Sequence, residues 1–488
     1  MKESKPNLDP LGQSRRRWMV TSAAVVAGTV TACGGSSGNG GTGNDASCFP
    51  GDAPPAELPV PDAPRCTARI DSTPAAPDEE RFSAWNAALR AQAGGRESAF
   101  VDLDAIDDNL NLVGNTLGSN IALRFVAKSL PCPQLLEYMM VMACTNRVMA
   151  FSEGMTRDLL CRFGSDVDIL LGRPQAVDAA RRTFDTLEGR FAGPNPAGGV
   201  RWLVDTAERM QAYADLAEER DQEISISVEI DVGLRRGGAR DDEELLEMMA
   251  VIDQSSLLRF TGFMGYDGQV PFAPTGDPTR ELLAVQERYA AFVDAARSVY
   301  PGLLEGSLVF NSGGSRTYHY YTDELDTVVN EVAMGSAFFY PSNFSNIPET
   351  GLRRASFLAS PVLKRIDPAE APFAPGYLPR LAEENPDYEA QFVLVAGGFP
   401  GDVVYPEGLV PNPVTTSVGG EQSGGVVNLL PNQAEWLGAR SLPLAVGDFV
   451  FYHPWEGDAV RWLRRLDVFR GGQLVDQWST FQPGIGLV

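Results

Sequence analysis

Histidine is nearly missing from this sequence, and its scarcity excludes one class of site. Only His319 and His453 occur in 488 residues, so a zinc site built mainly from histidines cannot form. Six cysteines are present, but none form a Cys-x-x-Cys pair, which argues against a zinc ribbon or a thioredoxin-like redox centre. No Gly-x-Gly-x-x-Gly follows the first expected strand, so the dinucleotide-binding fingerprint is missing too.

Positive charge is also scarce. Lysine and arginine together number 40, against 64 aspartates and glutamates, and the formal net charge is -24. So acidic a chain is a poor partner for nucleic acid or for anionic lipid surfaces. The chain shows no internal repeat beyond a Gly/Ser-rich stretch, which argues against a structural or adhesive role.

The N-terminal residues resemble an export signal. Arg15 and Arg16 resemble the pair of a twin-arginine signal, and the apolar stretch behind them is too short to span a bilayer. Residues 30–33 resemble a lipobox. We therefore expect residues 1–33 to be a lipoprotein signal that leaves Cys33 lipidated, with a plain signal and an incidental cysteine as the alternative.

A tether is expected next, over residues 34–85, flexible where it is Gly/Ser-rich and stiffer where it is Pro-rich. Together with the signal it predicts a protein exported by the twin-arginine route. The protein would be held on the periplasmic or outer face of a membrane by its lipid anchor only.

The remaining cysteines fall into two groups. Cys48 and Cys66 flank the Pro-rich segment and could pair in an oxidising compartment, although sequence cannot establish connectivity. Cys132, Cys144 and Cys161 lie in apolar, helix-like surroundings, where we expect buried thiols.

Short apolar runs alternate with amphipathic helical stretches from about residue 100 onward. This α/β pattern, repeated about eight times, predicts a (β/α)8 TIM-type barrel over residues 86–350, with a doubly wound sheet as the alternative. Over residues 351–488 short β-like runs dominate between Gly and Pro clusters, which predicts a second, all-β domain. Candidate barrel strands are 122–125, 148–151, 168–171, 200–204, 224–230, 260–266, 308–311 and 328–334.

Lys128 follows an apolar run, residues 121–127, just before a turn. Desolvation at such a position lowers the pKa of a lysine and makes its amine nucleophilic, as Schiff-base chemistry with an aldehyde requires. The alternative is a strand-end charge whose side chain reaches water.

Three further motifs each close an apolar run. They are residues 230–238, 260–268 and 310–317, and a fourth segment, 330–339, follows them. Functional groups of a β/α barrel lie at the carboxyl ends of its strands, where these motifs are expected. In the third motif small residues and hydroxyl groups could cradle a phosphate, or the glycines could merely allow a turn; its residues are Ser312, Gly313, Gly314, Ser315 and Thr317.

In this order the motifs resemble fold type III pyridoxal-phosphate (PLP) enzymes. Within the alanine racemase superfamily, residues 95–485 look like the branch of D-threonine aldolase, D-serine dehydratase and amino-acid deaminases. Leu123, Arg124 and Lys128 match its Leu-Arg-Pro-His-x-Lys pattern, while Phe125 and Val126 replace the proline and histidine. The resemblance implies that Lys128 carries the cofactor pyridoxal 5'-phosphate.

The resemblance also assigns roles to other residues. Gly335 and Ser336 would complete the phosphate cup, and Arg236 would pair with the cofactor phenolate or the substrate carboxylate. Tyr266 would lie beside the cofactor ring, with plain packing and catalysis both open. Asp458 would act as a catalytic carboxylate.

The family's metal-binding Pro-x-His-x-Cys motif is altered here. The matching stretch is residues 454–458, in which Glu456 and Asp458 replace the softer ligands. These two could hold Mn²⁺ or Mg²⁺. A metal-free carboxylate at Asp458 is the alternative that we favour.

We expect a PLP-dependent lyase or deaminase that acts on a small D- or β-hydroxy amino acid. An exported PLP- or amino-acid-binding lipoprotein without turnover is one alternative. An amino-acid racemase is another, less favoured because racemisation requires a base on each face of the substrate. A homodimer remains open.

The anchoring hypothesis can be tested by fractionation. Cys33→Ser is expected to release the protein from membranes or to block its maturation, because the lipid attachment site is lost. Replacing Arg15 and Arg16 by lysine is expected to leave the protein in the cytoplasm. Unchanged membrane fractions in both variants would contradict the hypothesis.

Overall fold

The structure is a computed structural model that describes residues 78–188, 195, 197–344, 351–371, 374–418, 426–428 and 433–481. Arg15, Arg16, Cys33, Cys48 and Cys66 lie outside the described residues, as do the predicted signal and most of the tether. Among the described residues, no helix is both long enough and apolar enough to cross a membrane.

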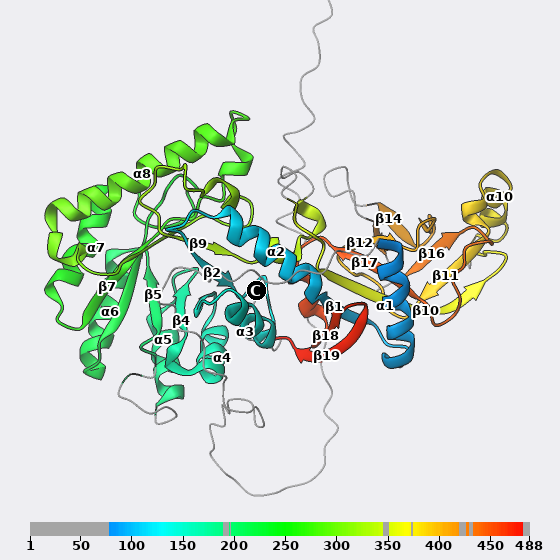
Figure 1. Ribbon diagram of the computed structural model, residues 1–488, viewed down its shortest axis with the longest axis horizontal. Coiled ribbons are helices and arrows are strands. Elements are labelled where there is room, and N and C mark those ends of the chain that lie inside the picture. The colour runs from blue at the N-terminus through cyan, green and yellow to red at the C-terminus, as the bar shows by residue number, and fades with distance from the viewer. Residues whose placement is uncertain are drawn as a thin grey trace, which may run out of the picture. The chain divides into compact units, whose positions relative to one another are not determined.

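A closed parallel barrel of eight strands forms the larger part of the fold (Figure 1). The strands are β2 (Ala122–Val126), β3 (Arg147–Ala150), β4 (Asp168–Leu171), β5 (Val200–Val204), β6 (Ile224–Glu229), β7 (Leu258–Met264), β8 (Val309–Ser312) and β9 (Glu331–Met334). The barrel closes because β9 pairs in parallel with β2, with Ala122 opposite Glu331. The prediction of a TIM-type barrel is therefore confirmed.

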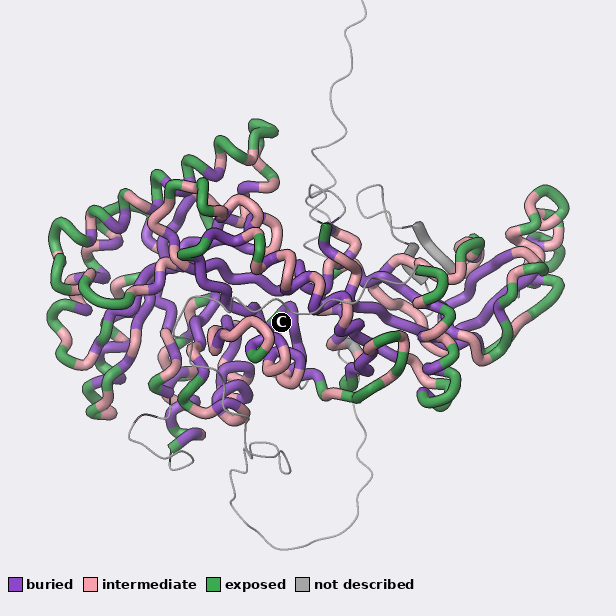
Figure 2. The backbone as a smooth tube through the Cα atoms, in the orientation of Figure 1, coloured by how far each residue is buried: buried purple, intermediate pink, exposed green. Residues whose placement is uncertain are grey.

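Helices follow the strands and cover the outside of the barrel. They are α2 (Leu103–Thr116), α3 (Pro133–Met142), α4 (Glu153–Phe163), α5 (Val177–Leu187), α6 (Ala207–Arg220), α7 (Asp242–Gln254), α8 (Pro278–Val299) and α9 (Ser336–Phe339). Several begin at side-chain caps, such as Thr206 accepting from the Arg209 N–H. In Figure 2 the barrel strands are buried, and the helices that surround them are exposed on their outer faces.

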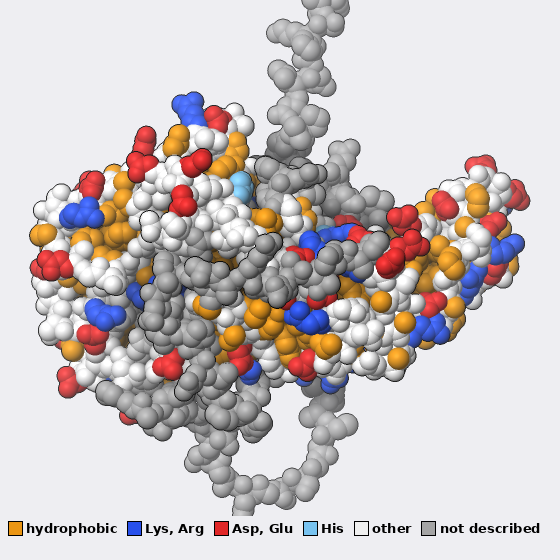
Figure 3. Space-filling view, in the orientation of Figure 1, with side chains coloured by type: hydrophobic (Ala, Val, Ile, Leu, Met, Phe, Trp, Pro, Cys, Tyr) orange, Lys and Arg blue, Asp and Glu red, His pale blue; other side chains and the backbone are white. Residues whose placement is uncertain are grey.

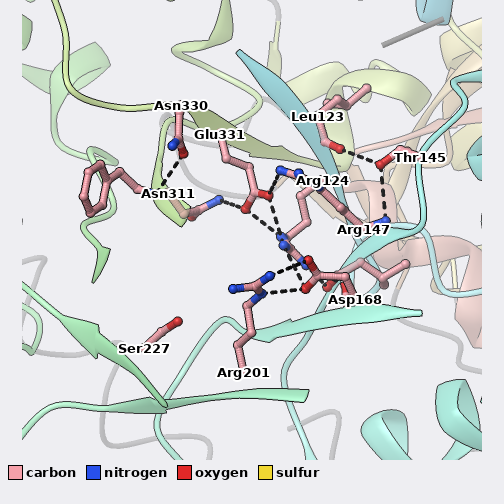
Figure 4. Close-up of polar contacts among 12 residues, drawn as sticks. Leu123, Arg124, Thr145, Arg147, Asp168, Arg201, Ser227, Asn311, Asn330 and Glu331 are labelled. Atoms are coloured by element: carbon pink, nitrogen blue, oxygen red, sulfur yellow. Dashed lines mark hydrogen bonds and ion pairs between the residues drawn. The ribbon is translucent and has the colours of Figure 1, made fainter. Parts of the chain in front are cut away.

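Charged residues fill part of the barrel interior, where aliphatic side chains usually pack. Arg124 on β2 is wholly buried and forms a two-pronged ion pair with Glu331 on β9, at 2.6 and 3.0 Å. Arg124 also contacts Asp168 on β4 at 3.1 Å, and Arg201 on β5 pairs with the same carboxylate at 2.8 Å. Figure 4 shows this ladder of compensated charges, which also includes Arg147.

The second domain is built on a largely antiparallel sheet. Its strands are β1 (Ser98–Asp102), β10 (Ser356–Ile366), β11 (Ala390–Leu394), β12 (Gly401–Tyr405), β13 (Val410–Pro411), β16 (Glu435–Gly438), β17 (Phe449–Pro454), β18 (Arg465–Arg470) and β19 (Gln473–Ser479). A separate pair joins β14 (Thr416–Val418) to β15 (Val426–Asn428), and α10 (Tyr377–Glu384) interrupts the strands. The predicted sheet domain is confirmed, and the barrel and sheet belong to one compact unit.

The domain boundary differs from the predicted one. Residues 86–102 were expected in the barrel domain, but β1 pairs with β10 and, in parallel, with β18. Helix α1 (Asp78–Gln92) packs on the same sheet, where Phe82 and Trp85 join an aromatic cluster. The reason is tertiary, because most ring partners of these two side chains, such as Phe357 and Phe451, lie on strands that come more than 250 residues later in the chain.

The cysteines divide differently from the prediction. Cys132 is a buried free thiol, as expected. The prediction was wrong for Cys144 and Cys161, because both are disulfide-bonded. An apolar, helix-like setting indicated burial, but whether a second cysteine comes within bonding distance depends on the fold.

Acidic and basic side chains are interspersed with apolar ones on the face drawn in Figure 3. Many of the surface arginines form ion pairs, such as Arg182 with Glu153 at 2.6 Å.

Candidate functional site

A cavity of about 240 Å³ opens at the carboxyl ends of the barrel strands. Its lining comes from the carboxyl ends of the barrel strands and from the segments that follow β2, β3, β4, β6, β7, β8 and β9, together with Glu456 after β17 of the sheet domain. This is the end of a β/α barrel where functional groups are expected. Lys128, Tyr266 and Arg236 all contribute to it, so the fold brings these predicted site residues together.

Lys128 lies in the turn directly after β2, and its side chain is exposed to the cavity. Its Nζ lies 4.8 Å from the centroid of the Phe151 ring. Loss of hydration and the charge of Arg236 lower the pKa of Lys128, while Asp458 and Glu456 oppose this shift. A larger share of the amine is therefore neutral and nucleophilic than in an ordinary lysine.

Lysine is so rare in this chain that Lys128 stands nearly alone. The sequence has four lysines, and Lys364 is the only other one after residue 5. Lys364 lies on β10 and is exposed. Chemistry that requires a lysine amine at the barrel mouth therefore falls to Lys128.

Two short loops form a cradle at one side of the cavity. The Ser315 hydroxyl accepts hydrogen bonds from the N–H groups of Gly335 and Ala337, both at 3.1 Å, which joins the loop after β8 to the loop after β9. The backbone N–H groups of Gly314, Ser315 and Ser336 donate to no described residue. Such unspent N–H groups beside a helix start suit a phosphate group.

The glycines of the cradle are needed for close packing. A Cβ on Gly314 would lie 2.9 Å from the Tyr266 ring. A Cβ on Gly335 would lie 2.8 Å from the Ser129 Cβ. Only residues without a side chain let the backbone approach the cavity at these positions.

Two of the predicted phosphate contacts lie elsewhere. The Ser312 hydroxyl donates to the Gly265 carbonyl at 2.6 Å, and the Thr317 hydroxyl donates to Asp267 at 2.9 Å. Tyr321 bonds to both Ser312 and Asp267. These two hydroxyl groups therefore hold the loop after β8 in place and do not line the cavity.

Arg236 lies against the ring of Tyr266, with its Cζ 5.2 Å from the ring centroid. It forms no ion pair with a described residue, so its guanidinium donors remain available to the cavity. Removal from water and the charge of Asp267 raise the pKa of Tyr266, which favours its protonated, hydrogen-bond-donating form.

The two C-terminal carboxylates take different places. Glu456 lines the cavity and accepts from Asn343 Nδ2 at 2.5 Å. Burial and the charge of Asp458 raise the pKa of Glu456. Asp458 itself pairs with Arg461 at 3.6 Å and acts on Lys128 through its charge. Within the described part of the chain, no group of three His, Cys, Asp or Glu side chains is placed to hold a metal.

Sequence reasoning missed two cavity residues. Arg316, next to the predicted loop residues, lies 4.6 Å from the Phe344 ring and donates to the Asn343 carbonyl at 2.8 Å. Asn311, at the end of β8, lines the cavity while 3% exposed. Arg316 was within reach, because a charged residue in a predicted phosphate loop is a signal in itself.

Comparison with known proteins agrees with this geometry. Residues 101–342 match the family model "Alanine racemase, N-terminal domain". The chain is 25% identical over 265 residues to 3-hydroxy-D-aspartate aldolase of Paracoccus denitrificans (strain Pd 1222). That match spans 52% of this chain and 62% of the aldolase, which is less than two thirds of the relative's length.

Two solved structures share the fold. D-threonine aldolase from Filomicrobium marinum superposes with a TM-score of 0.56 at 17% identity, over 78% of this chain and 93% of that one. Alanine racemase from Clostridium difficile 630 gives a TM-score of 0.56 at 15% identity, over 79% and 98%.

The cavity fits pyridoxal 5'-phosphate, the cofactor of this family. A lysine of lowered pKa and a cradle of unspent backbone N–H groups supply a covalent attachment point and a phosphate site within one cavity. Residues 101–342 thus belong to the alanine racemase N-terminal domain family, the barrel domain of fold type III pyridoxal-phosphate proteins.

Proposed function

We propose that this protein is a PLP-dependent lyase acting on a small β-hydroxy amino acid of the D series. The observation that carries the proposal is the shared cavity of Lys128, Glu456 and two arginines that pair with no described carboxylate. When bound, PLP supplies an electron sink for charge that develops at the substrate Cα. Lys128 binds the cofactor and exchanges a proton at the substrate.

Glu456 is the group that we assign to the substrate hydroxyl. Its raised pKa makes the carboxylate a stronger base than that of an ordinary glutamate, as a group that takes the proton of the substrate hydroxyl requires. The hydrogen bond from Asn343 holds the carboxylate at the cavity wall. Asp458, which we predicted as catalytic, lies just outside this lining, and we assign it the role of tuning Lys128 through its charge.

The substrate class that fits best is a dicarboxylic β-hydroxy amino acid. Arg236 can take one carboxylate, and Arg316 can take the other. Arg316 is held by the Asn343 carbonyl and by the rings of Phe344 and Phe272, so it presents its remaining donors in a defined orientation. The name of the Paracoccus relative, an aldolase for 3-hydroxy-D-aspartate, supports the same class.

We also propose that the protein works outside the cytoplasm, held by lipid at Cys33. The disulfide bonds of Cys144 and Cys161 support this location, because disulfides persist in oxidising compartments. The twin-arginine route carries folded proteins, so a cofactor could be loaded before export. A second copy of the chain, bound in a homodimer, is a further partner that we propose.

Lys128→Ala is expected to abolish the visible absorbance band of the PLP-loaded protein and to prevent trapping of the cofactor by borohydride. Lys364→Ala is the matched control, because Lys364 is the other lysine among the described residues and lies exposed on the sheet. After reduction, peptide mapping should place the cofactor on Lys128. A colourless protein that cannot be reconstituted would contradict both the enzyme and the PLP-binding readings.

Glu456→Gln is expected to lower turnover about a hundred- to ten-thousand-fold, the usual effect of losing one oriented acid–base group. The assay should offer 3-hydroxyaspartate, threonine and serine in both configurations and measure ammonia, keto acid, aldehyde and racemisation. Asp458→Asn should retain more turnover than Glu456→Gln. It should also move the pH at which Lys128 captures the cofactor to a lower value. The sign follows because the Asp458 charge raises the pKa of Lys128.

Other results of the same assay would change the assignment. Equal rates in wild type and Glu456→Gln would remove this residue from the mechanism. Activity restored only by Mn²⁺ would make Glu456 and Asp458 metal ligands. Binding without any turnover would favour the lipoprotein that only binds amino acids, and racemisation alone would favour a racemase.

Arg316→Met is expected to raise the KM for 3-hydroxyaspartate about ten- to a hundred-fold, the value of a charge-assisted hydrogen bond to a carboxylate. D-threonine is the matched control substrate, because it has no second carboxylate and should be nearly unaffected. An equal loss for both substrates would show that Arg316 does not select dicarboxylates.

A further inference from the structure

We propose that Asn311 recognises the ring nitrogen of PLP and keeps that nitrogen protonated, through an amide whose orientation is imposed by the buried ion pairs of the barrel. The inference concerns how this chain binds its cofactor. It does not depend on the lyase reaction proposed above.

The orientation of the Asn311 amide follows from its partner. Nδ2 of Asn311 donates to Oε1 of Glu331 at 2.9 Å (Figure 4). An ionised carboxylate can only accept hydrogen bonds, so the amide nitrogen must face Glu331 and the amide oxygen must face away from it. Oδ1 has no hydrogen-bond partner among the described residues, and Asn311 lines the cavity. The oxygen is therefore an acceptor directed to the cavity floor.

Glu331 is held ionised by arginines. Burial alone would raise its pKa, but Arg124 and Arg147 reverse that effect and lower the pKa of Glu331. Arg124 cannot turn away, because it also donates to the carbonyls of Val148 at 3.0 Å and Asp168 at 2.6 Å. The Glu331 carboxylate, and with it the Asn311 amide, therefore has a single arrangement in which its hydrogen bonds are satisfied.

The position of Asn311 suits the far side of a bound ring. In pyridoxal the ring nitrogen is opposite the carbon that carries the aldehyde, so it points away from the lysine. Of the polar side chains in the described cavity lining, only Ser129 and Asn311 are buried. Ser129 shares the turn of Lys128, whereas Asn311 lies on β8, which β9 separates from β2, so Asn311 is the buried polar group that stands apart from the lysine.

An acceptor at this point selects the protonated ring. A neutral pyridine nitrogen has only a lone pair, which an amide oxygen repels, whereas a protonated nitrogen donates a charge-assisted hydrogen bond. The bond from Nδ2 to Glu331 polarises the amide and strengthens its oxygen as an acceptor. A protonated ring withdraws electrons more strongly, which suits bond cleavage at the substrate.

The first test uses the wild-type holoenzyme. With PLP labelled with ¹⁵N at the ring, the nitrogen resonance reports protonation directly, whether or not the enzyme turns over. We expect the protonated signal across neutral pH. An unprotonated ring nitrogen would overturn the proposal without any variant.

The second test compares the affinity for PLP with that for 1-deaza-PLP, in which carbon replaces the ring nitrogen. Wild type should prefer PLP about ten- to a hundred-fold, the value of one charge-assisted hydrogen bond. Asn311→Leu should remove this preference and the protonated resonance. Met264→Leu is the control, because Met264 lines the same cavity without a polar donor and the exchange nearly conserves volume.

The outcomes separate the two proposals. An unchanged preference in Asn311→Leu would overturn this one, whatever the turnover. A holoenzyme with a protonated ring that converts no β-hydroxy amino acid would support this inference and reject the proposed reaction.

Discussion

The ion pair between Arg124 and Glu331 is the constraint on which the site depends. Both side chains are wholly buried inside the barrel, where an unpaired charge would be very unfavourable. Removing one partner of such a pair typically costs about 3–5 kcal/mol, because the other charge is left without compensation. The pair also joins β2, which leads to Lys128, to β9, which leads to Gly335 and Ser336. The strand that carries the lysine and a strand that carries the phosphate cradle are thereby fixed to each other.

Charges in the cavity are distributed so that one region stays positive. Lys128, Arg236 and Arg316 face the cavity, while Glu456 is the carboxylate among the described residues that line it. A cofactor phosphate would supply one anion for this region, and the substrate that we propose would supply carboxylates. Arg236 and Arg316 rest on aromatic rings, which hold a guanidinium in place without neutralising it.

The sheet domain takes part in this site through one short segment. Glu456 and Asp458 follow β17, which pairs with β10, and Asn343 holds Glu456 from the barrel side. The carboxylate that lines the cavity is thus supplied by a different domain from the one that supplies the lysine.

Much of the fold and part of the site could be predicted from the sequence. The alternation of strands and helices predicted the barrel, because parallel strands buried on both faces read as short apolar runs. Lys128 was recognisable because a lone lysine ends such a run, whereas Arg236 and Tyr266 were indicated by the resemblance of their motifs to those of the family. These features are set by residues that are close together in the chain, so they can be recognised in the sequence.

The rest was decided by tertiary structure. Phe82 and Trp85 place the N-terminal helix on the distant sheet, and no local pattern names that partner. Ser312 and Thr317 look like Ser315 in sequence, yet only Ser315 lines the cavity, since Asp267 and Gly265 bind the other hydroxyls. The sequence by itself determined which chemical groups stand at the strand ends. Only the closure of the barrel, by bringing β9 against β2, decided which of them face the cavity.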